Sequence, residues 1–301
     1  MDKQGQDTTP SDSRRLQGRQ ALVFGAGAAA AEGPGWSCGK RTETAWGVGK
    51  ATAIVYARAG AVVTCIDKSI EAAQDTAARI RDEGGEAYAL ACDITQSAAV
   101  SAAVERHMAR AGRVDILHNN IGIVATGGPV ETSEEDFDRV IAANLKGMYL
   151  TCKYVLPIME RQGKGSIINI SSIASVRFTV PWIAYNASKG AVNAMTMGIA
   201  AQYAPSGVRC NAIAPGLLST PMVVAPHQKD HADFDHLMRA RDSVVPMGWQ
   251  GEGWDVGSAA VFLSSDEARF ITGLVMMVDG GSSLCIPNTP WGRTAQSAQP
   301  A

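Results

Sequence analysis

A serine, a tyrosine and a lysine are spaced along one stretch of the chain in a way that suits proton transfer. Tyr185 and Lys189 stand four positions apart in a helical pattern, so they share one face of a helix. A lysine ammonium beside a phenol favours the phenolate, which lowers the phenol pKa from about 10. Ser172 follows the apolar run 167–170, whose composition is typical of a buried strand. Together the three side chains predict a site that protonates or deprotonates a carbonyl or alcohol oxygen.

The start of the chain carries the parts of a dinucleotide-binding unit. A strand, a glycine-rich turn, a helix and a second strand follow one another at residues 20–24, 25–49, 51–59 and 62–66. The turn begins at Gly25 and ends on Gly47, Val48 and Gly49, and the second strand runs into Asp67. Glycines let the backbone approach a pyrophosphate, whose charge the N–H groups of a helix start stabilise. The acid is placed to accept hydrogen bonds from the adenosine ribose.

Together with these dinucleotide-binding features, Ser172, Tyr185 and Lys189 resemble the active site of the short-chain dehydrogenase/reductase family. The motifs of this family follow in order over roughly residues 16–281. The resemblance implies one α/β domain, a Rossmann-type doubly wound parallel sheet of about seven strands with helices on both faces. It makes Tyr185 the general acid/base and Ser172 the group that orients the substrate oxygen. Lys189 then lowers the tyrosine pKa and binds the nicotinamide ribose. Asn144 matches the family's active-site asparagine, whose backbone holds a water in a proton relay.

The resemblance also implies a set of cofactor contacts. A carboxylate at Asp67 favours the free 2′-hydroxyl of NAD and repels the 2′-phosphate of NADP, so NAD is the expected cofactor and NADP the alternative. Lys68 beside it softens that preference. Besides the glycine turn, Tyr185 and Lys189, the implied contacts are Asp93 and Ile94 at the adenine, Asn119 and Gly122 at the ribose, and Pro215, Gly216, Leu218 and Thr220 near the nicotinamide.

The glycine turn departs from the family pattern. Gly47 stands 22 positions after Gly25, where the pattern has four, so residues 26–46 contain an insertion. The insertion holds a second turn of the same kind at Gly39, similar to a longer loop in a subset of the family. We favour Gly47 and Gly49 as the helix start, because an apolar helical pattern follows them directly. A disordered insert and a flap over the phosphates or the substrate both stay open.

Composition and charge restrict the class of protein. The chain has 301 residues, 46% of them hydrophobic, and a net charge of −2 without a long basic run, which argues against a nucleic-acid partner. Its apolar stretches are shorter than the roughly 20 residues that span a bilayer, and its first residues are polar. Six scattered cysteines without a CxxC pair suggest buried free thiols. We therefore expect a cytoplasmic protein that does not associate with membranes.

The chain is expected to form one domain, residues 17–287, between an N-terminal tail, 1–16, and a C-terminal tail, 288–301. A long helical pattern is expected to break or end near Pro157. Residues 222–250 are polar and aromatic and correspond to the family's substrate lid. Three histidines of this lid are expected to be solvated, with no metal site: His227, His231 and His236.

The function predicted from these features is NAD-dependent hydride transfer between nicotinamide and a secondary alcohol or ketone. The alternatives are an NADP-dependent 3-ketoacyl thioester reductase and a non-catalytic dinucleotide-binding regulator. The end of the final strand resembles that of family members in which this edge of the sheet often packs in a homotetramer. A homotetramer or a homodimer is therefore expected. Steroids, cyclic diols, sugars and small ketones all stay open as substrates.

Overall fold

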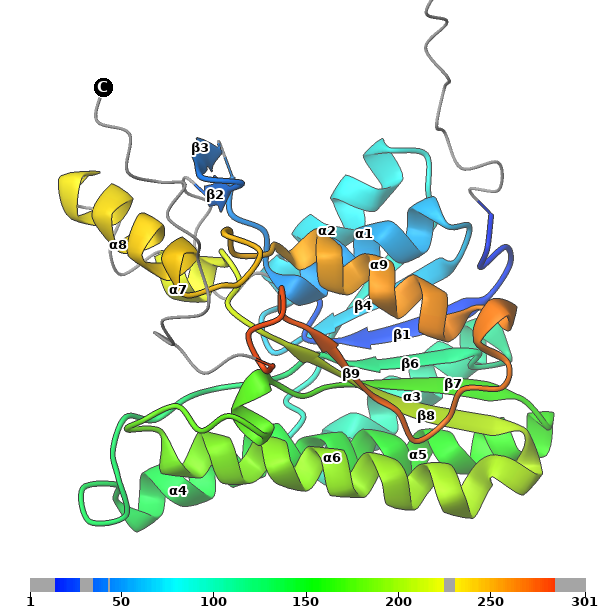
Figure 1. The fold of residues 1–301 in the computed structure, drawn as a ribbon. Coiled ribbons are helices and arrows are strands. Elements are labelled where there is room, and N and C mark those ends of the chain that lie inside the picture. Colours follow the sequence, from blue (N-terminus) through cyan, green and yellow to red (C-terminus); the bar gives the residue numbers. More distant parts are fainter. Residues whose placement is uncertain (1–13, 28–34, 43, 225–230, 285–301) are drawn as a thin grey trace, which may run out of the picture.

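The computed structural model describes residues 14–27, 35–42, 44–224 and 231–284. Its central sheet has seven parallel strands in the order β5-β4-β1-β6-β7-β8-β9 (Figure 1). The bounds of these strands are β1 Gln20–Phe24, β4 Val62–Asp67, β5 Ala87–Ala91, β6 Ile116–Asn119, β7 Gly165–Ile170, β8 Val208–Pro215 and β9 Val275–Val278. The doubly wound α/β fold with about seven strands is thereby confirmed.

The strand order reverses between β1 and β6. Strands β4 and β5 extend the sheet on one side of this point, and β7, β8 and β9 follow β6 on the other. Phe24 pairs in register with Ile66 of β4 and with Asn119 of β6, so the loops after these three strands leave one edge of the sheet together. In open α/β sheets, ligands bind at this edge where the strand order reverses.

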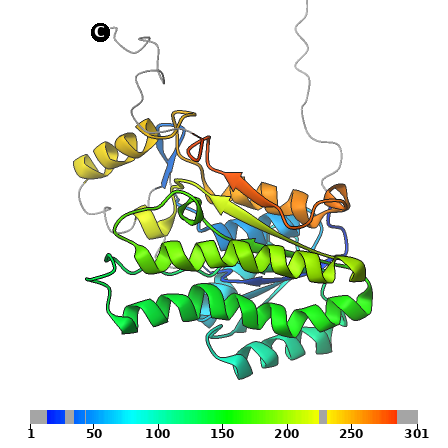
Figure 2. The same ribbon diagram turned by 60° about the horizontal axis from the view of Figure 1, so that its bottom comes forward.

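Helices cover both faces of the sheet (Figures 1 and 2). One face carries α1 Val48–Arg58, α2 Ile70–Asp82 and α9 Gly253–Ser264, and the other carries α3 Ser97–Ala111, α5 Gly147–Gln162 and α6 Ile183–Tyr203. Since both faces are covered, the central strands are buried nearly throughout, including all four residues of β6 and all six of β7. The short 3₁₀ turns are Ile173–Ser175, Ala204–Ser206 and Asp266–Ala268.

The long helical segment is interrupted at a different place from the one expected. Helix α4, Glu134–Ile141, runs into a π-helical segment, Ala142–Lys146, from which α5 continues. Pro157 lies inside α5, which ends only at Gly163 in the left-handed conformation. Pro157 is exposed, so the carbonyl that its ring leaves without a helical donor faces water. The expectation of a break at Pro157 is therefore wrong.

The described part of the insertion is an antiparallel hairpin, β2 Gly35–Ser37 and β3 Lys40–Thr42. Cys38 and Gly39 form its tip, with φ values of 47° and 79°. Positive φ at both central residues is the geometry of a tight hairpin turn, which is why the glycine at this place does not start a helix. Helix α1 begins instead after Gly47, as expected. A disordered insert is wrong for these residues.

The hairpin lies beside the two helices of the segment that is predicted to form the lid (Figure 1). These are α7, Pro221–Val224, and α8, His231–Ser243. A small apolar core joins the hairpin to α8, apart from the two larger cores on the faces of the sheet.

Four of the five described cysteines are buried free thiols, as expected: Cys65, Cys92, Cys152 and Cys210. Cys38 at the hairpin tip is exposed, and Cys285 lies outside the described residues. Among the described helices, none combines the length and the apolar character that crossing a membrane requires.

Candidate active site

The structure brings the serine, the tyrosine and the lysine together at the carboxyl end of β7. Ser172 follows this strand and has an extended backbone, and the first turns of α6 carry Tyr185 and Lys189. The Tyr185 phenol lies near the Ser172 hydroxyl, which acts on the phenol pKa. The Lys189 Nζ lies 5.7 Å from the centre of the Tyr185 ring. The arrangement predicted from spacing is therefore present as a contact cluster.

Lys189 carries a buried amine that has a carbonyl partner. Its side chain is 2% exposed, and its Nζ donates to the Ile170 carbonyl at 2.8 Å. Burial lowers its pKa to about 7, because a charged amine loses hydration there. A Cβ on Gly122 would stand 3.3 Å from this Nζ, so the glycine makes room for the ammonium. Gly122, predicted as a ribose contact, thus lies beside the catalytic cluster.

The Tyr185 pKa differs from the sequence-based expectation. Burial raises the pKa of this phenol, and the nearby Ser172 hydroxyl only partly opposes the rise. Trp182 stands edge-to-face with the phenol ring at 6.2 Å between ring centres and contributes to its apolar surroundings. Lys189 is itself only partly protonated near neutral pH. The expected lowering of the Tyr185 pKa is therefore wrong, because burial disfavours the charged phenolate and is the largest cause of the shift.

Asn144 sits in the π-helical segment and is fully buried. Its amide accepts from the Ile123 N–H at 2.8 Å and donates to the Ile123 carbonyl at 2.9 Å. It also donates to the Ser188 hydroxyl at 3.1 Å, which in turn donates to the Tyr185 carbonyl at 2.7 Å. These bonds fasten the segment after β6 to α6. Since π-helical turns occur frequently at functional sites, the placement suits the predicted relay through the Asn144 backbone.

The glycine turn closes despite the insertion. Gly25 has a φ of 79°, which favours glycine. A Cβ on Gly49 would stand 1.9 Å from the Gly25 carbonyl oxygen, so the start of α1 packs backbone to backbone on the first part of the turn. Asn120 donates to the same carbonyl at 3.2 Å. The residues on both sides of the insertion therefore meet as they would in an uninterrupted turn.

Asp67 stands beside this turn at the end of β4. Its carboxylate accepts from the Gly27 N–H at 3.0 Å and from the Ser69 N–H at 3.2 Å. Lys68 points elsewhere, because its ammonium pairs with Asp93 at 3.2 Å. Thr95 first, and Lys68 after it, hold the pKa of the Asp93 carboxyl below its usual value. Asp67 is thus the acid that faces the glycine turn.

Two predicted cofactor residues have buried side chains. Asn119 donates to Asn169 at 2.9 Å and accepts from Thr151 at 2.8 Å, and it is fully buried. Its side chain therefore ties β6 to β7 and α5 inside the core, which supports the predicted role in holding the sheet but not a side-chain contact with the ribose. Ile94 is 5% exposed and packs where a Cβ of Gly147 would stand.

The predicted nicotinamide contacts follow β8, which ends on Pro215. Gly216 donates to the Val278 carbonyl at 2.9 Å, and a Cβ there would stand 2.6 Å from Asp279, so this turn packs tightly on the end of β9. The Leu218 carbonyl accepts from Arg241 of α8 at 3.2 Å. Thr220 comes directly before α7. The turn thus links the sheet edge to the lid.

Sequence reasoning missed Asn120, Ile123 and Ser188, which position the glycine turn and the active-site asparagine. The sequence contained a signal for Asn120, because it is the second of two consecutive asparagines at the end of a buried strand.

Of the lid histidines, His227 lies outside the described residues, and α8 carries His231 and His236. Within the described ranges, groups of three metal-ligating side chains are not found.

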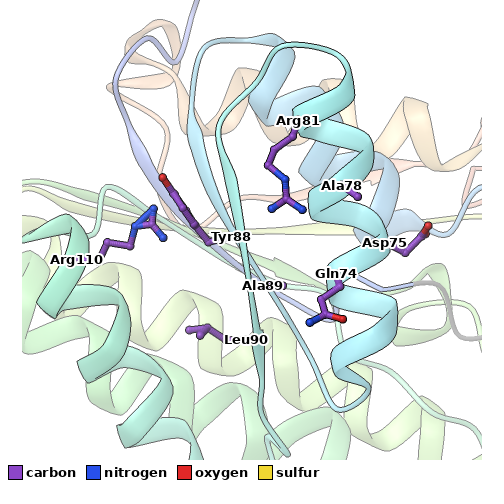
Figure 3. A pocket seen from close by; sticks show the side chains of 8 residues that line it. All are labelled: Gln74, Asp75, Ala78, Arg81, Tyr88, Ala89, Leu90 and Arg110. Carbon is purple, nitrogen blue, oxygen red and sulfur yellow. The ribbon is translucent and has the colours of Figure 1, made fainter.

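A separate hollow of about 640 Å³ lies on the outer edge of the sheet (Figure 3). It is lined by α2, β5 and one residue of α3, Arg110, which stacks on the Tyr88 ring. None of the predicted site residues lines it. Arg81 in its wall donates to the Ala87 carbonyl at 3.1 Å.

Known proteins share both the fold and this site region. The family model described as Enoyl-(Acyl carrier protein) reductase matches residues 43–283. A 2-keto-3-deoxy-L-fuconate dehydrogenase from Xanthomonas campestris pv. campestris is 36% identical over 277 residues, which is 92% of this chain and 83% of that protein.

Two solved structures are similar over the same range. A structure from Burkholderia xenovorans that is assigned to the short-chain dehydrogenases/reductases is 40% identical, with a TM-score of 0.82 over 90% of this chain and 99% of that one. A gluconate 5-dehydrogenase from Burkholderia cenocepacia, in complex with NADP and tartrate, is 32% identical, with a TM-score of 0.78 over 91% and 99% of the two chains.

The chain belongs to the short-chain dehydrogenase/reductase family. It is an oxidoreductase of this family that acts on CH–OH groups. The residues present fit a nicotinamide dinucleotide: a glycine turn packed on a helix start, a carboxylate beside it, and a buried lysine at the catalytic cluster.

Proposed function

We propose that the protein is an NAD-dependent dehydrogenase that transfers a hydride between nicotinamide and a secondary alcohol or ketone. The observation that carries the proposal is the cluster of Ser172, Tyr185 and buried Lys189 at the carboxyl end of β7. Bound dinucleotide supplies the hydride acceptor in one direction and the donor in the other. All other parts of the reaction come from the chain itself.

In alcohol oxidation, Tyr185 takes the hydroxyl proton of the substrate as the carbonyl forms, and in reduction it returns that proton. Ser172 holds the same substrate oxygen through a hydrogen bond. Lys189 donates to a ribose hydroxyl and, when charged, stabilises the phenolate. The π-helical segment around Asn144 supports a relay that exchanges the proton with solvent. The raised pKa of Tyr185 favours the protonated phenol, which suits the reducing direction near neutral pH.

The preference for NAD rests on Asp67 and Lys68. The Asp67 carboxylate faces the glycine turn, where it suits a free ribose 2′-hydroxyl and opposes a 2′-phosphate. The neighbouring cation is engaged by Asp93 and supports NADP less than a free lysine would. Reduction of a 3-ketoacyl thioester with NADP is the second candidate, and the description of the matching family model and the NADP of the gluconate 5-dehydrogenase favour it.

Titration with NADH and NADPH, followed by nucleotide fluorescence, tests the cofactor choice. We expect NADH to bind at least about tenfold more tightly, because like charges brought together cost several kcal/mol. The Asp67→Asn variant should lose most of this difference while its NADH affinity changes less. Tighter binding of NADPH by the unaltered protein would contradict the proposal and favour the thioester reductase. If neither nucleotide binds, the result would favour a protein that has the family's fold but no dehydrogenase activity.

We also propose a homotetramer or a homodimer. Strand β9 is an edge strand of the sheet, and Phe270, which precedes it, is 99% exposed. An open edge beside exposed apolar side chains suits association with a second copy. Light scattering on the purified protein, with Phe270→Glu for comparison, measures the assembly.

A further inference from the structure

The inserted hairpin is attached to the lid by one large side chain. Trp36 is 2% exposed and packs with Phe234 and Met238 of α8 in a core separate from those of the sheet. Its indole N–H donates to the buried carboxylate of Asp242, also in α8, at 2.7 Å. Its backbone N–H donates to the Ser219 hydroxyl at 2.9 Å. One residue of the insertion therefore holds both the lid helix and the turn after β8.

Two further contacts fasten the hairpin on either side of Trp36. The Arg41 guanidinium pairs with Asp235 of α8 at 2.6 Å and lies 4.8 Å from the centre of the Phe234 ring. The Ser37 side chain lies near the Glu252 carboxyl, at the start of α9, where it partly opposes the rise of the Glu252 pKa that burial causes. The hairpin thus contacts α8 and the turn before α7, and it lies near the start of α9.

Hairpin and lid helix depend on each other for their stability. Two strands of three residues each are too short to be stable in water alone. A helix of 13 residues is equally marginal unless its apolar face is covered. In α8 that face, with Phe234 and Met238, is covered by Trp36 and Ala45. The insertion therefore supplies the packing that holds α8 in place.

We propose that Trp36 is a positioning residue that fixes the lid helix to the dinucleotide-binding turn. In the sequence, the hairpin lies between Gly27 and Gly47. The residues on both sides of it therefore belong to the turn that would hold the phosphates. A dinucleotide that orders this turn then also orders α8 through Trp36, and the substrate meets a lid that is already in place. This inference rests on the proposed function, because it gives the insertion a role at that same site.

Hydrogen exchange of the α8 amides tests the attachment in the protein without ligand. Trp36→Phe keeps an aromatic ring and removes the indole donor to Asp242. We expect the α8 amides to exchange roughly tenfold faster in this variant, as the loss of a hydrogen bond to a charged group implies. NADH should slow exchange in α8 of the unaltered protein and slow it less in the variant. Trp254→Phe is the matched control, because Trp254 packs on Trp46 and not on α8.

Kinetics separate a positioning role from general destabilisation. With a substrate found by screening, Trp36→Phe should raise the substrate KM about tenfold and leave kcat within about twofold, since the chemistry at Tyr185 is untouched. Unchanged exchange in α8 of Trp36→Phe would overturn the inference, and so would an equal change in the Trp254→Phe control. If α8 exchanges as expected but NADH does not bind the unaltered protein, the attachment stands and the proposed dehydrogenase function fails.

Discussion

The catalytic cluster and the glycine turn lie at the same edge of the sheet but are assembled in different ways. The cluster comes from a single stretch, in which β7, one loop and the first turns of α6 bring Ser172, Tyr185 and Lys189 together. The turn is assembled from Gly25 and Gly49, which an insertion separates in the chain and which touch through their backbones. A site made of side chains depends on spacing, whereas a site made of backbone tolerates an insertion wherever its two ends can meet.

The largest effect is expected at the catalytic cluster. Tyr185→Phe removes the proton donor and acceptor, so the rate should fall about 10²–10⁴-fold. NADH affinity should change much less, because the glycine turn and Lys189 are unaltered. Steady-state kinetics together with NADH titration measure the two effects. A variant that keeps near-full activity would remove Tyr185 from the mechanism.

A smaller effect is expected at the glycine turn, where a substitution should weaken NADH binding and leave the rate nearly unchanged. Gly49→Ala places a Cβ against the Gly25 carbonyl, and this overpacking should weaken NADH binding about 10- to 100-fold. At saturating NADH, kcat should stay close to that of the unaltered protein. Gly198→Ala in α6 is the control, because a Cβ there meets open space. Equal NADH affinity in both variants would show that the two ends of the insertion do not form a binding turn.

The smallest effect concerns stability and pH. Burial lowers the Lys189 pKa from 10.5 to about 7, so between these values the folded protein binds fewer protons than the unfolded chain. Stability therefore rises with pH across that window, by about 1–2 kcal/mol from pH 7 to pH 8.5. Denaturant unfolding at the two pH values measures the rise. Lys189→Met should show a rise smaller by that amount, and an identical rise in both proteins would contradict the lowered pKa.

Regular patterns of strands and helices led to correct predictions. The errors arose where a single residue type is compatible with more than one local structure. Alternating strands and helices with buried, β-branched strands indicate a doubly wound sheet, because only covered strands can be apolar on both faces. Pro157 misled, because an exposed proline can remain inside a helix while a π-helical segment interrupts the pattern elsewhere. Asn119 misled in part, because the end of a strand does not say whether a side chain turns to the ligand or into the core.

The sequence by itself determined the family and the order of the elements, and it predicted the three side chains of the cluster, because these follow from residue type and from spacing within single elements. Only the tertiary structure decided which glycine starts α1, where the insertion packs, and in which direction the Tyr185 pKa moves. Each of these depends on burial and on contacts between residues distant in the chain. Trp36 and Asp242 are 206 positions apart, and no local pattern relates them.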